Sequence, residues 1–300
     1  MSSATSPTGS ISGRNDPIVE REVARILEAH RTMEGGGFPV RRPFPVPGIS
    51  HVDPFLLIDE MGPVTWAPGA AIGAPEHPHR GFETVTYLLD GHMQHEDSAG
   101  NQGDLRPGDV QWMTAGRGVI HSELPHPEFK RRGGRTHGFQ IWINLPSRHK
   151  MMPPRYQDIP ASSIPLATDE PNKATVRVVA GTCLGVEAVI DTVIPITYLD
   201  IELGPGGCLF QPISPESTVL LHVFEGSFQI GGRGDHVTDG QCAVLTEGSN
   251  IQLRSEDGGR MLLLAGMPTN EPVARYGPFV MNTRDEILQA IEDFRSGTLA

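Results

Sequence analysis

The segments HPHRGFETVTYLLDG (77–91) and PGDVQWMTAGRGVIHSE (107–123) each contain one apolar run of strand length, bounded by glycine, proline or aspartate. Runs bounded in this way are typical of β-strands. Similar runs occur at PFLLIDE (54–60) and FQIWINL (139–145), and no amphipathic helical pattern separates them. The lack of such helices favours antiparallel pairing over β-α-β units. We therefore expect an all-β fold.

A second series of strand-length runs follows a proline-rich linker, PSRHKMMPPRYQDIP (146–160). Its members are TVRVVAG (175–181), ITYLDIEL (196–203), TVLLHVFEG (218–226) and CAVLTEG (242–248). The turn glycines keep their spacing, because Gly108 and Gly116 align with Gly240 and Gly248. Such a repeat predicts two similar antiparallel β-barrel domains, the second a divergent copy of the first.

Composition and local patterns suggest where these parts begin and end. The expected parts are a disordered Ser/Thr/Gly-rich tail (1–18), a first domain (19–160), a second domain (161–275) and a C-terminal segment (276–300). Apolar residues from Val19 to Leu27 fit neither a strand period nor a helix period, so both states stay open there. In the last segment, Thr283 and Glu286 form a capping box ahead of an apolar stripe. This pattern predicts a short C-terminal amphipathic helix.

Charge and cysteine content narrow the functional class. The net charge is −12, so the surface repels phosphate backbones and anionic lipids, and we expect no direct nucleic-acid or membrane binding. No apolar stretch is long enough to span a bilayer. The three cysteines are widely spaced and form no C-x-x-C pair, which indicates reduced thiols. We therefore expect a cytoplasmic protein.

Two pairs of polar residues carry the chemistry. Eight of the 12 histidines fall between residues 77 and 149. His77 and His79 are two residues apart, as are His121 and Glu123, and a strand places residues at this spacing on one face. Two such pairs facing each other would bring three imidazoles and one carboxylate to a single point. That donor set is typical of a divalent-metal site with two open octahedral positions.

The second copy of the repeat lacks these residues. The position of H-P-H is occupied by Gln211, Pro212 and Ile213, and the position of H-S-E by the run Leu253–Ser255. The turns remain while the candidate ligands are missing, so the fold of this unit does not require them. We therefore predict that the first domain alone binds metal.

Other polar residues in the first domain have weaker patterns. His92 and His95 are three residues apart and would lie on opposite faces of a strand, so we interpret them as hairpin-loop residues. Glu83 follows His79 by four residues and stays a candidate pocket residue. The remaining histidines of the window, His126, His137 and His149, are expected in core or surface positions, and the basic run FKRRGGR (129–135) in a solvated loop. Glycine patterns such as GGRG (231–234) lack a strand-then-helix context, so no dinucleotide cofactor is expected.

The first two segments, together with GFQIWINLP (138–146), MMPPRYQDI (151–159) and GPFVMNT (277–283), resemble the pirins, a two-domain family of the cupin superfamily. The resemblance covers residues 40–294. The general cupin second motif has a histidine followed four residues later by an asparagine, whereas His121 with Glu123 is the pirin variant. The resemblance implies two cupin barrels, with a metal held in the first by His77, His79, His121 and Glu123. It also implies iron, as Fe(II), although Mn, Co, Ni, Cu and Zn suit the same donors.

The resemblance leaves two functions open. Several prokaryotic pirins are similar to quercetin 2,3-dioxygenases, which implies a metal-dependent dioxygenase acting on a flavonol-like aromatic substrate and O₂. Glu123 would then serve as catalytic general base as well as ligand. Trp112 and Met113 would either shape the substrate pocket or pack in the core. Animal pirins instead modulate transcription factors, which implies a non-enzymatic, redox-sensitive iron-binding regulator that acts through a protein partner.

Overall fold

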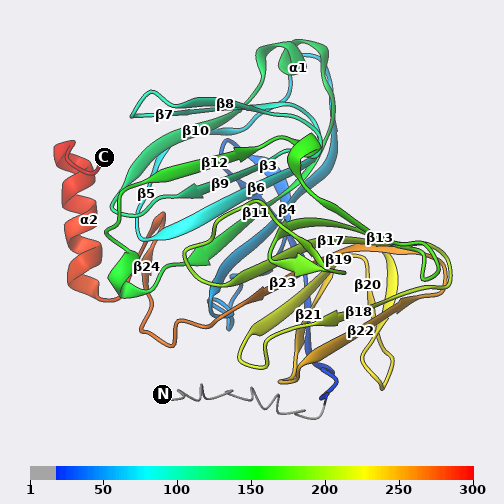
Figure 1. Ribbon diagram of the computed structural model, residues 1–300. Coiled ribbons are helices and arrows are strands. Elements are labelled where there is room, and N and C mark those ends of the chain that lie inside the picture. The colour runs from blue at the N-terminus through cyan, green and yellow to red at the C-terminus, as the bar shows by residue number, and fades with distance from the viewer. Residues whose placement is uncertain (1–17) are drawn as a thin grey trace, which may run out of the picture.

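The computed structural model describes residues 18–300, which form two stacked β-barrels with a C-terminal helix beside the first (Figure 1). The predicted all-β class is confirmed, as are two cupin barrels followed by a short helix. Residues 1–17 of the predicted disordered tail lie outside the described part of the chain. Neither α-helix of the described residues is long and apolar enough to cross a membrane.

The first barrel consists of two antiparallel sheets. The larger sheet has the strand order β12-β9-β6-β11-β4-β3-β2 and the smaller sheet the order β5-β10-β7-β8. The strands of the larger sheet are β2 (His30–Glu34), β3 (Phe38–Phe44), β4 (Phe55–Trp66), β6 (Phe82–Asp90), β9 (Val110–Thr114), β11 (Gly134–Asn144) and β12 (Arg155–Ile159). Those of the smaller sheet are β5 (Ala74–His79), β7 (Met93–Asp97), β8 (Gln102–Leu105) and β10 (Val119–Pro125).

The second barrel repeats this arrangement. Its main sheet has the order β1-β21-β19-β23-β17-β14-β13, so β21-β19-β23-β17 reproduces the order β9-β6-β11-β4 of the first barrel. The main strands are β1 (Val23–Glu28), β13 (Leu166–Asp169), β14 (Ala174–Ala180), β17 (Ile196–Leu203), β19 (Thr218–Ile230), β21 (Gln241–Leu245) and β23 (Gly259–Gly266). The opposite face is built from β18 (Gly207–Pro212), β20 (Asp235–Thr238) and β22 (Asn250–Ser255). Two further hairpins are β15 (Thr182–Cys183) with β16 (Val186–Glu187), and β24 (Ala274–Tyr276) with β25 (Phe279–Met281).

The first strand of the chain joins the second barrel. The segment that the sequence left open between strand and helix is β1, and it pairs with β21 so that Leu27 faces Cys242. This strand lies within the predicted first domain (19–160) but extends the sheet of the second barrel. The boundaries at residues 160 and 275 stay a prediction.

One apolar core lies between the two large sheets. It joins Trp112 and Phe139 of the first barrel to Tyr198 and Leu264 of the second. The Trp112 side chain is fully buried here, so of the two roles considered for it, core packing is the one observed. Met113 is also fully buried, in a small separate cluster. Large buried aromatic side chains such as these dominate the packing energy of an interface.

A buried ionic cluster crosses the same interface. The Glu60 carboxylate accepts hydrogen bonds from Nε2 of His137 (2.9 Å) and Nε2 of His222 (3.0 Å), and from Nε of Arg41 (3.0 Å). Arg41 also donates to Asp239 of the second barrel, at 2.8 Å. Burial raises the pKa of Glu60, but the hydrogen bonds from the two histidines outweigh it and lower that pKa to about 2. Glu60 is therefore an anion that ties the barrels together.

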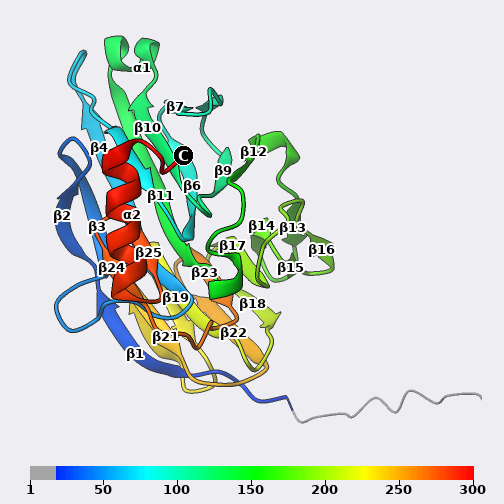
Figure 2. The same ribbon diagram turned by 90° about the vertical axis from the view of Figure 1, so that its left-hand side faces the viewer.

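The two α-helices are α1 (Pro127–Arg132) and α2 (Arg284–Ser296), and short 3-10 turns lie at Ser147–His149 and Ala161–Ser163. The basic run 129–135, interpreted from the sequence as a loop, is half helical, because Pro127 opens α1 and Gly133 closes it. The predicted capping box is confirmed: Glu286 donates its amide to Thr283 Oγ1, and Thr283 donates its amide to Glu286 Oε2. Figure 2 shows α2 lying over β24 and β25, where it buries Ile287 and Ala290.

Loss of this cap should weaken α2 measurably. Thr283→Ala removes the oxygen that accepts the Glu286 amide, and such a loss costs about 1 kcal/mol. We expect a decrease of that size in the free energy of unfolding, measured with denaturant. Glu286→Gln preserves the reciprocal hydrogen bonds and should cost much less. Equal losses in the two variants would contradict this interpretation of the cap.

Candidate metal centre

Strands β5 and β10 lie side by side and carry the predicted ligands. Their antiparallel register places His77 opposite His121, and His79 opposite Val119. The ring centroids of the three imidazoles are between 4.5 and 4.9 Å apart. One nitrogen atom of each ring lies within 4.8 Å of the others. The structure thus brings three of the four predicted ligands into one group.

Hydrogen bonding fixes the orientation of the His77 ring. Its Nδ1 lies 2.8 Å from the carbonyl oxygen of Pro75, which can only accept, so Nδ1 carries the proton and Nε2 a lone pair. This Nε2 lies 3.0 Å from Nε2 of His121. Two nitrogen ligands about 2.1 Å from one metal ion, in neighbouring octahedral positions, are about 3.0 Å apart. The pair has the spacing of two metal ligands, or of a ring-to-ring hydrogen bond without metal.

The other two imidazoles are buried. His79 is 2% exposed and His121 is 1% exposed, and neither nitrogen of His79 has a hydrogen-bond partner among residues 18–300. A buried imidazole without a partner is costly unless a ligand satisfies it. Burial lowers the pKa of His79 and of His121 well below the usual range, so both rings are neutral. Neutral imidazole is the form that binds metal, and the donor set therefore fits a metal ion.

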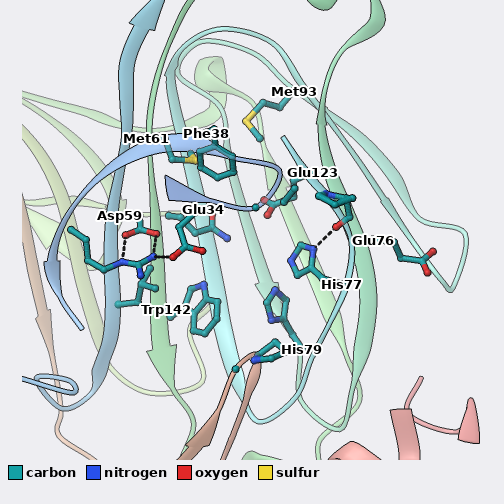
Figure 3. Close-up of a pocket in the computed structure, with 18 of the residues that line it drawn as sticks. Glu34, Phe38, Asp59, Met61, Glu76, His77, His79, Met93, Glu123 and Trp142 are labelled. Carbon is teal, nitrogen blue, oxygen red and sulfur yellow. Dashed lines mark hydrogen bonds and ion pairs between the residues drawn. The ribbon is translucent and has the colours of Figure 1, made fainter. Parts of the chain in front are cut away.

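Glu123 lies on the same cavity but outside this group of three. The register of β10 shifts between His121 and Glu123, so that Glu123 pairs with Ala74. Its Oε1 accepts a hydrogen bond from Thr86 Oγ1 at 2.9 Å. The cavity is lined by both Glu123 and two of the imidazoles, His77 and His79. Figure 3 shows these three side chains facing one space.

The cavity beside the imidazoles has a volume of about 500 Å³. Volumes of this size are typical of small-molecule sites. Apolar and aromatic side chains form much of its wall, chiefly Phe38, Met61, Met93 and Trp142. Trp142 also packs edge-on against His79, with ring centroids 5.2 Å apart. The cavity therefore combines an apolar wall with a polar end at the histidines.

A charged cluster closes the side of the cavity opposite the histidines (Figure 3). Arg42 forms ion pairs with Asp59 at 2.5 Å and with Glu34 at 2.6 Å. Burial raises the pKa of Asp59 to about 6, although Arg42 opposes this shift. Arg275 lies over the Trp142 ring, 4.8 Å from its centroid. This side of the cavity is therefore charged, and Arg275 joins it to the aromatic wall.

Comparison with known proteins shows to which family the chain belongs. The Pirin family profile matches residues 37–143, and the Pirin C-terminal cupin domain profile matches residues 198–300. Human pirin is 44% identical over 283 residues, which cover 92% of this chain and 93% of that protein. The chain belongs to the pirin family. A Pseudomonas aeruginosa protein, provisionally named a quercetin 2,3-dioxygenase, is 42% identical over 93% of this chain and 98% of its own length.

A solved structure of a pirin relative shows the same architecture. The crystal structure of quercetin 2,3-dioxygenase from Acinetobacter baumannii has a TM-score of 0.88 and 38% sequence identity. The match covers 94% of this chain and 99% of that one. The fold and the placement of both barrels in this pirin therefore follow those of that structure.

The second barrel of this pirin has apolar residues where the first has imidazoles. Leu253, aligned by sequence with His121, faces Leu209 across β18 and β22. Both leucines are buried in the core of the barrel. The sequence alignment placed Gln211 at the position of His77, so it is wrong by two residues on β18. In the part of the chain that the structure describes, both groups of three potential metal ligands lie in the first barrel.

Sequence reasoning misplaced two residues of the first barrel. His95, interpreted as a loop residue, lies on β7, and its Nδ1 is 3.3 Å from Nδ1 of His121. The three-residue spacing was judged as if His92 and His95 shared one strand, but β7 begins after His92 and contains only His95. Glu83, kept as a candidate pocket residue, is buried on β6 and accepts a hydrogen bond from Thr114 at 2.6 Å. It is not among the residues that line the cavity.

His92 belongs to the second group of potential ligands, with Asp104 and His126. The rings of His92 and His126 stack with centroids 3.9 Å apart. Nδ1 of His126 accepts the amide of Glu128 and so caps α1. The stacked pair therefore stabilises the start of this helix.

The GPFVMNT segment contributes to the cavity, because Gly277 and Pro278 form part of the lining. Lys150 holds this segment in place, because its buried ammonium donates to the carbonyl oxygens of Val280 and Gly81. Burial lowers the pKa of Lys150 to about 8. Gly81 has a φ of +91°, and a Cβ there would lie 2.0 Å from the Val280 oxygen. Glycine is therefore required at position 81, two residues after the predicted ligand His79.

Proposed function

We propose that this pirin is a metal-dependent dioxygenase that opens the ring of a flavonol such as quercetin with O₂. The observation that carries the proposal is the group His77, His79 and His121, whose nitrogens converge beside a cavity with an aromatic wall. The similarity to the Acinetobacter structure, which is named quercetin 2,3-dioxygenase, supports the choice of substrate.

In this proposal the three imidazoles and Glu123 hold one divalent metal ion, with Fe(II) as the native metal. Such an ion supplies the Lewis-acid and one-electron chemistry that the reaction of an enolate with O₂ requires. The open face of the group is turned toward the cavity, so the chain leaves room there for substrate. Leu209 and Leu253 occupy the corresponding place in the second barrel, which is proposed to be metal-free.

The residues around the metal ligands position the substrate and its proton. The aromatic wall formed by Phe38 and Trp142 binds a flat, apolar ring system and excludes water from it. Glu123 is the proposed general base, which takes the proton of the flavonol hydroxyl. The Thr86 hydrogen bond fixes Oε1 of this carboxylate, and fixed orientation of a base lowers the entropic cost of proton transfer.

Oxygen uptake on quercetin tests the proposal. The protein should be stripped of metal and reloaded separately with Fe(II), Mn(II), Co(II), Ni(II), Cu(II) and Zn(II). We expect at least one loaded form to consume O₂ while quercetin absorbance falls, and the stripped protein to consume none. Metal binding without O₂ uptake in any loaded form would contradict the enzymatic function and favour a regulatory protein.

A further inference from the structure

His95 lies directly behind the proposed metal ligand His121. It is the middle residue of β7, where it pairs with Glu123 on β10, and its side chain is 2% exposed. Its Nδ1 is 3.3 Å from Nδ1 of His121, on the opposite side of the His121 ring from His77. His121 is therefore held between two imidazoles, one at each ring nitrogen.

This arrangement determines which tautomers are allowed. A neutral imidazole carries one proton, so when Nε2 of His121 offers its lone pair to a metal, Nδ1 must carry the proton. A buried Nδ1–H needs an acceptor, and the atom within reach is Nδ1 of His95. In the metal-free protein, Nε2 of His121 can instead donate to His77, and Nδ1 of His121 then accepts from His95.

A histidine at position 95 serves both states, because its Nδ1 can donate or accept according to tautomer. A carboxylate or a carbonyl oxygen can only accept, so it could serve the metal-bound state but not the metal-free state. The remaining nitrogen of His95, Nε2, is buried without a hydrogen-bond partner in the described structure. The Tyr156 ring packs against this imidazole, with centroids 4.9 Å apart. The chain of hydrogen bonds that starts at His121 therefore ends at His95. The one hydrogen bond that His95 makes orients the His121 ring.

We propose that His95 is a positioning residue that fixes the tautomer and ring orientation of His121 for metal binding. The inference rests on the proposed metal site, and it adds a residue that makes no contact with the metal or the substrate. Partners that orient a metal-bound histidine in this way contribute about 10- to 100-fold to metal affinity.

Two substitutions separate positioning from packing. His95→Leu keeps the buried volume but removes the hydrogen-bond partner, so Zn(II) affinity, measured by competition with a chromogenic chelator, should fall about 10- to 100-fold. His95→Asn places an amide oxygen near the position of Nδ1, and this variant should bind Zn(II) within about threefold of the wild type. His236→Leu removes an exposed imidazole from β20 of the second barrel, which belongs to neither group of potential ligands, and it should leave the affinity unchanged.

Thermal unfolding of the three metal-free proteins completes the test. If His95 merely packs, Zn(II) affinity will follow the loss of stability, and His95→Asn will bind no better than His95→Leu. That result, or unchanged affinity in His95→Leu, overturns the inference. Failure of the proposed function has a different signature, because the wild type would then bind metal normally but consume no O₂. A wild type that binds no Zn(II) at all would overturn the inference together with the metal site.

Discussion

The His121→Ala variant is expected to lose metal and O₂ uptake together. Nε2 of the buried His121 ring lies 3.0 Å from Nε2 of His77, and the His121 and His79 ring centroids are 4.9 Å apart. Removal of this ligand leaves two imidazoles and a carboxylate, and should weaken metal binding by more than about 100-fold, beyond the loss expected for an outer partner. Metal content by mass spectrometry and O₂ uptake on quercetin measure the two effects.

The control for this variant is His236→Ala, which removes an exposed histidine from β20 of the second barrel. It should retain one metal ion per chain and full O₂ uptake. A His121→Ala protein that still holds a full equivalent of metal would contradict the assignment of the ligands. Loss of metal in both variants would show that the assay reports general damage to the protein.

The second large effect is expected at Glu60, in the ionic cluster between the two barrels. Glu60→Gln keeps the shape of the side chain but replaces one acceptor oxygen by an NH₂ group, which cannot accept from His137, His222 or Arg41. Breaking a buried ionic cluster in this way costs about 3–5 kcal/mol. We expect a loss of that size in the free energy of unfolding, with little change in metal content.

The effect at Glu60 should depend on pH in a defined direction. Its pKa is lowered in the folded protein to about 2, against 4.5 in the unfolded chain. A carboxylate with a lowered pKa stabilises the fold above its unfolded pKa, and this contribution disappears as the pH falls toward the folded pKa. The stability gap between wild type and Glu60→Gln should therefore be widest above pH 5 and shrink toward pH 2. A gap that widens on acidification would contradict this account.

Asp90→Asn provides the matched control for the same measurement. Asp90 pairs with Arg135 on the surface, where the two side chains are 46% and 55% exposed. Exposed pairs of this kind contribute less than about 1 kcal/mol. The contrast between the two carboxylates isolates the effect of burial.

The strand period of two was sufficient to predict how the ligand pairs are presented. It placed His77 and His79 on one face of β5, as observed, because this property depends on a single strand. The pairing of β5 with β10 is a long-range contact. The sequence led us to expect the two pairs to face each other, whereas they lie on neighbouring strands of one sheet. The register shift after His121 pairs Glu123 with Ala74 and so changes its position relative to His121. Local sequence carries no signal for such an irregularity.

The walls of the cavity could not be predicted for a related reason. Phe38, Met61 and Trp142 come from β3, β4 and β11, which meet only when the larger sheet is assembled. His95 was misplaced because a three-residue spacing from His92 was taken to describe one strand. Its pairing with Glu123 across β7 and β10 joins residues 28 positions apart in the sequence, so the local spacing does not show it. Domain-crossing contacts such as β1 with β21 are equally invisible to local patterns.

The most direct test of the proposed function is the fate of labelled oxygen. The metal-loaded protein should be supplied with quercetin under ¹⁸O₂, and the ring-opened product analysed by mass spectrometry. A dioxygenase is expected to place both heavy oxygen atoms in that product. A product that contains no label, or the appearance of the label as hydrogen peroxide with quercetin merely oxidised, would contradict the proposal that this pirin is a dioxygenase.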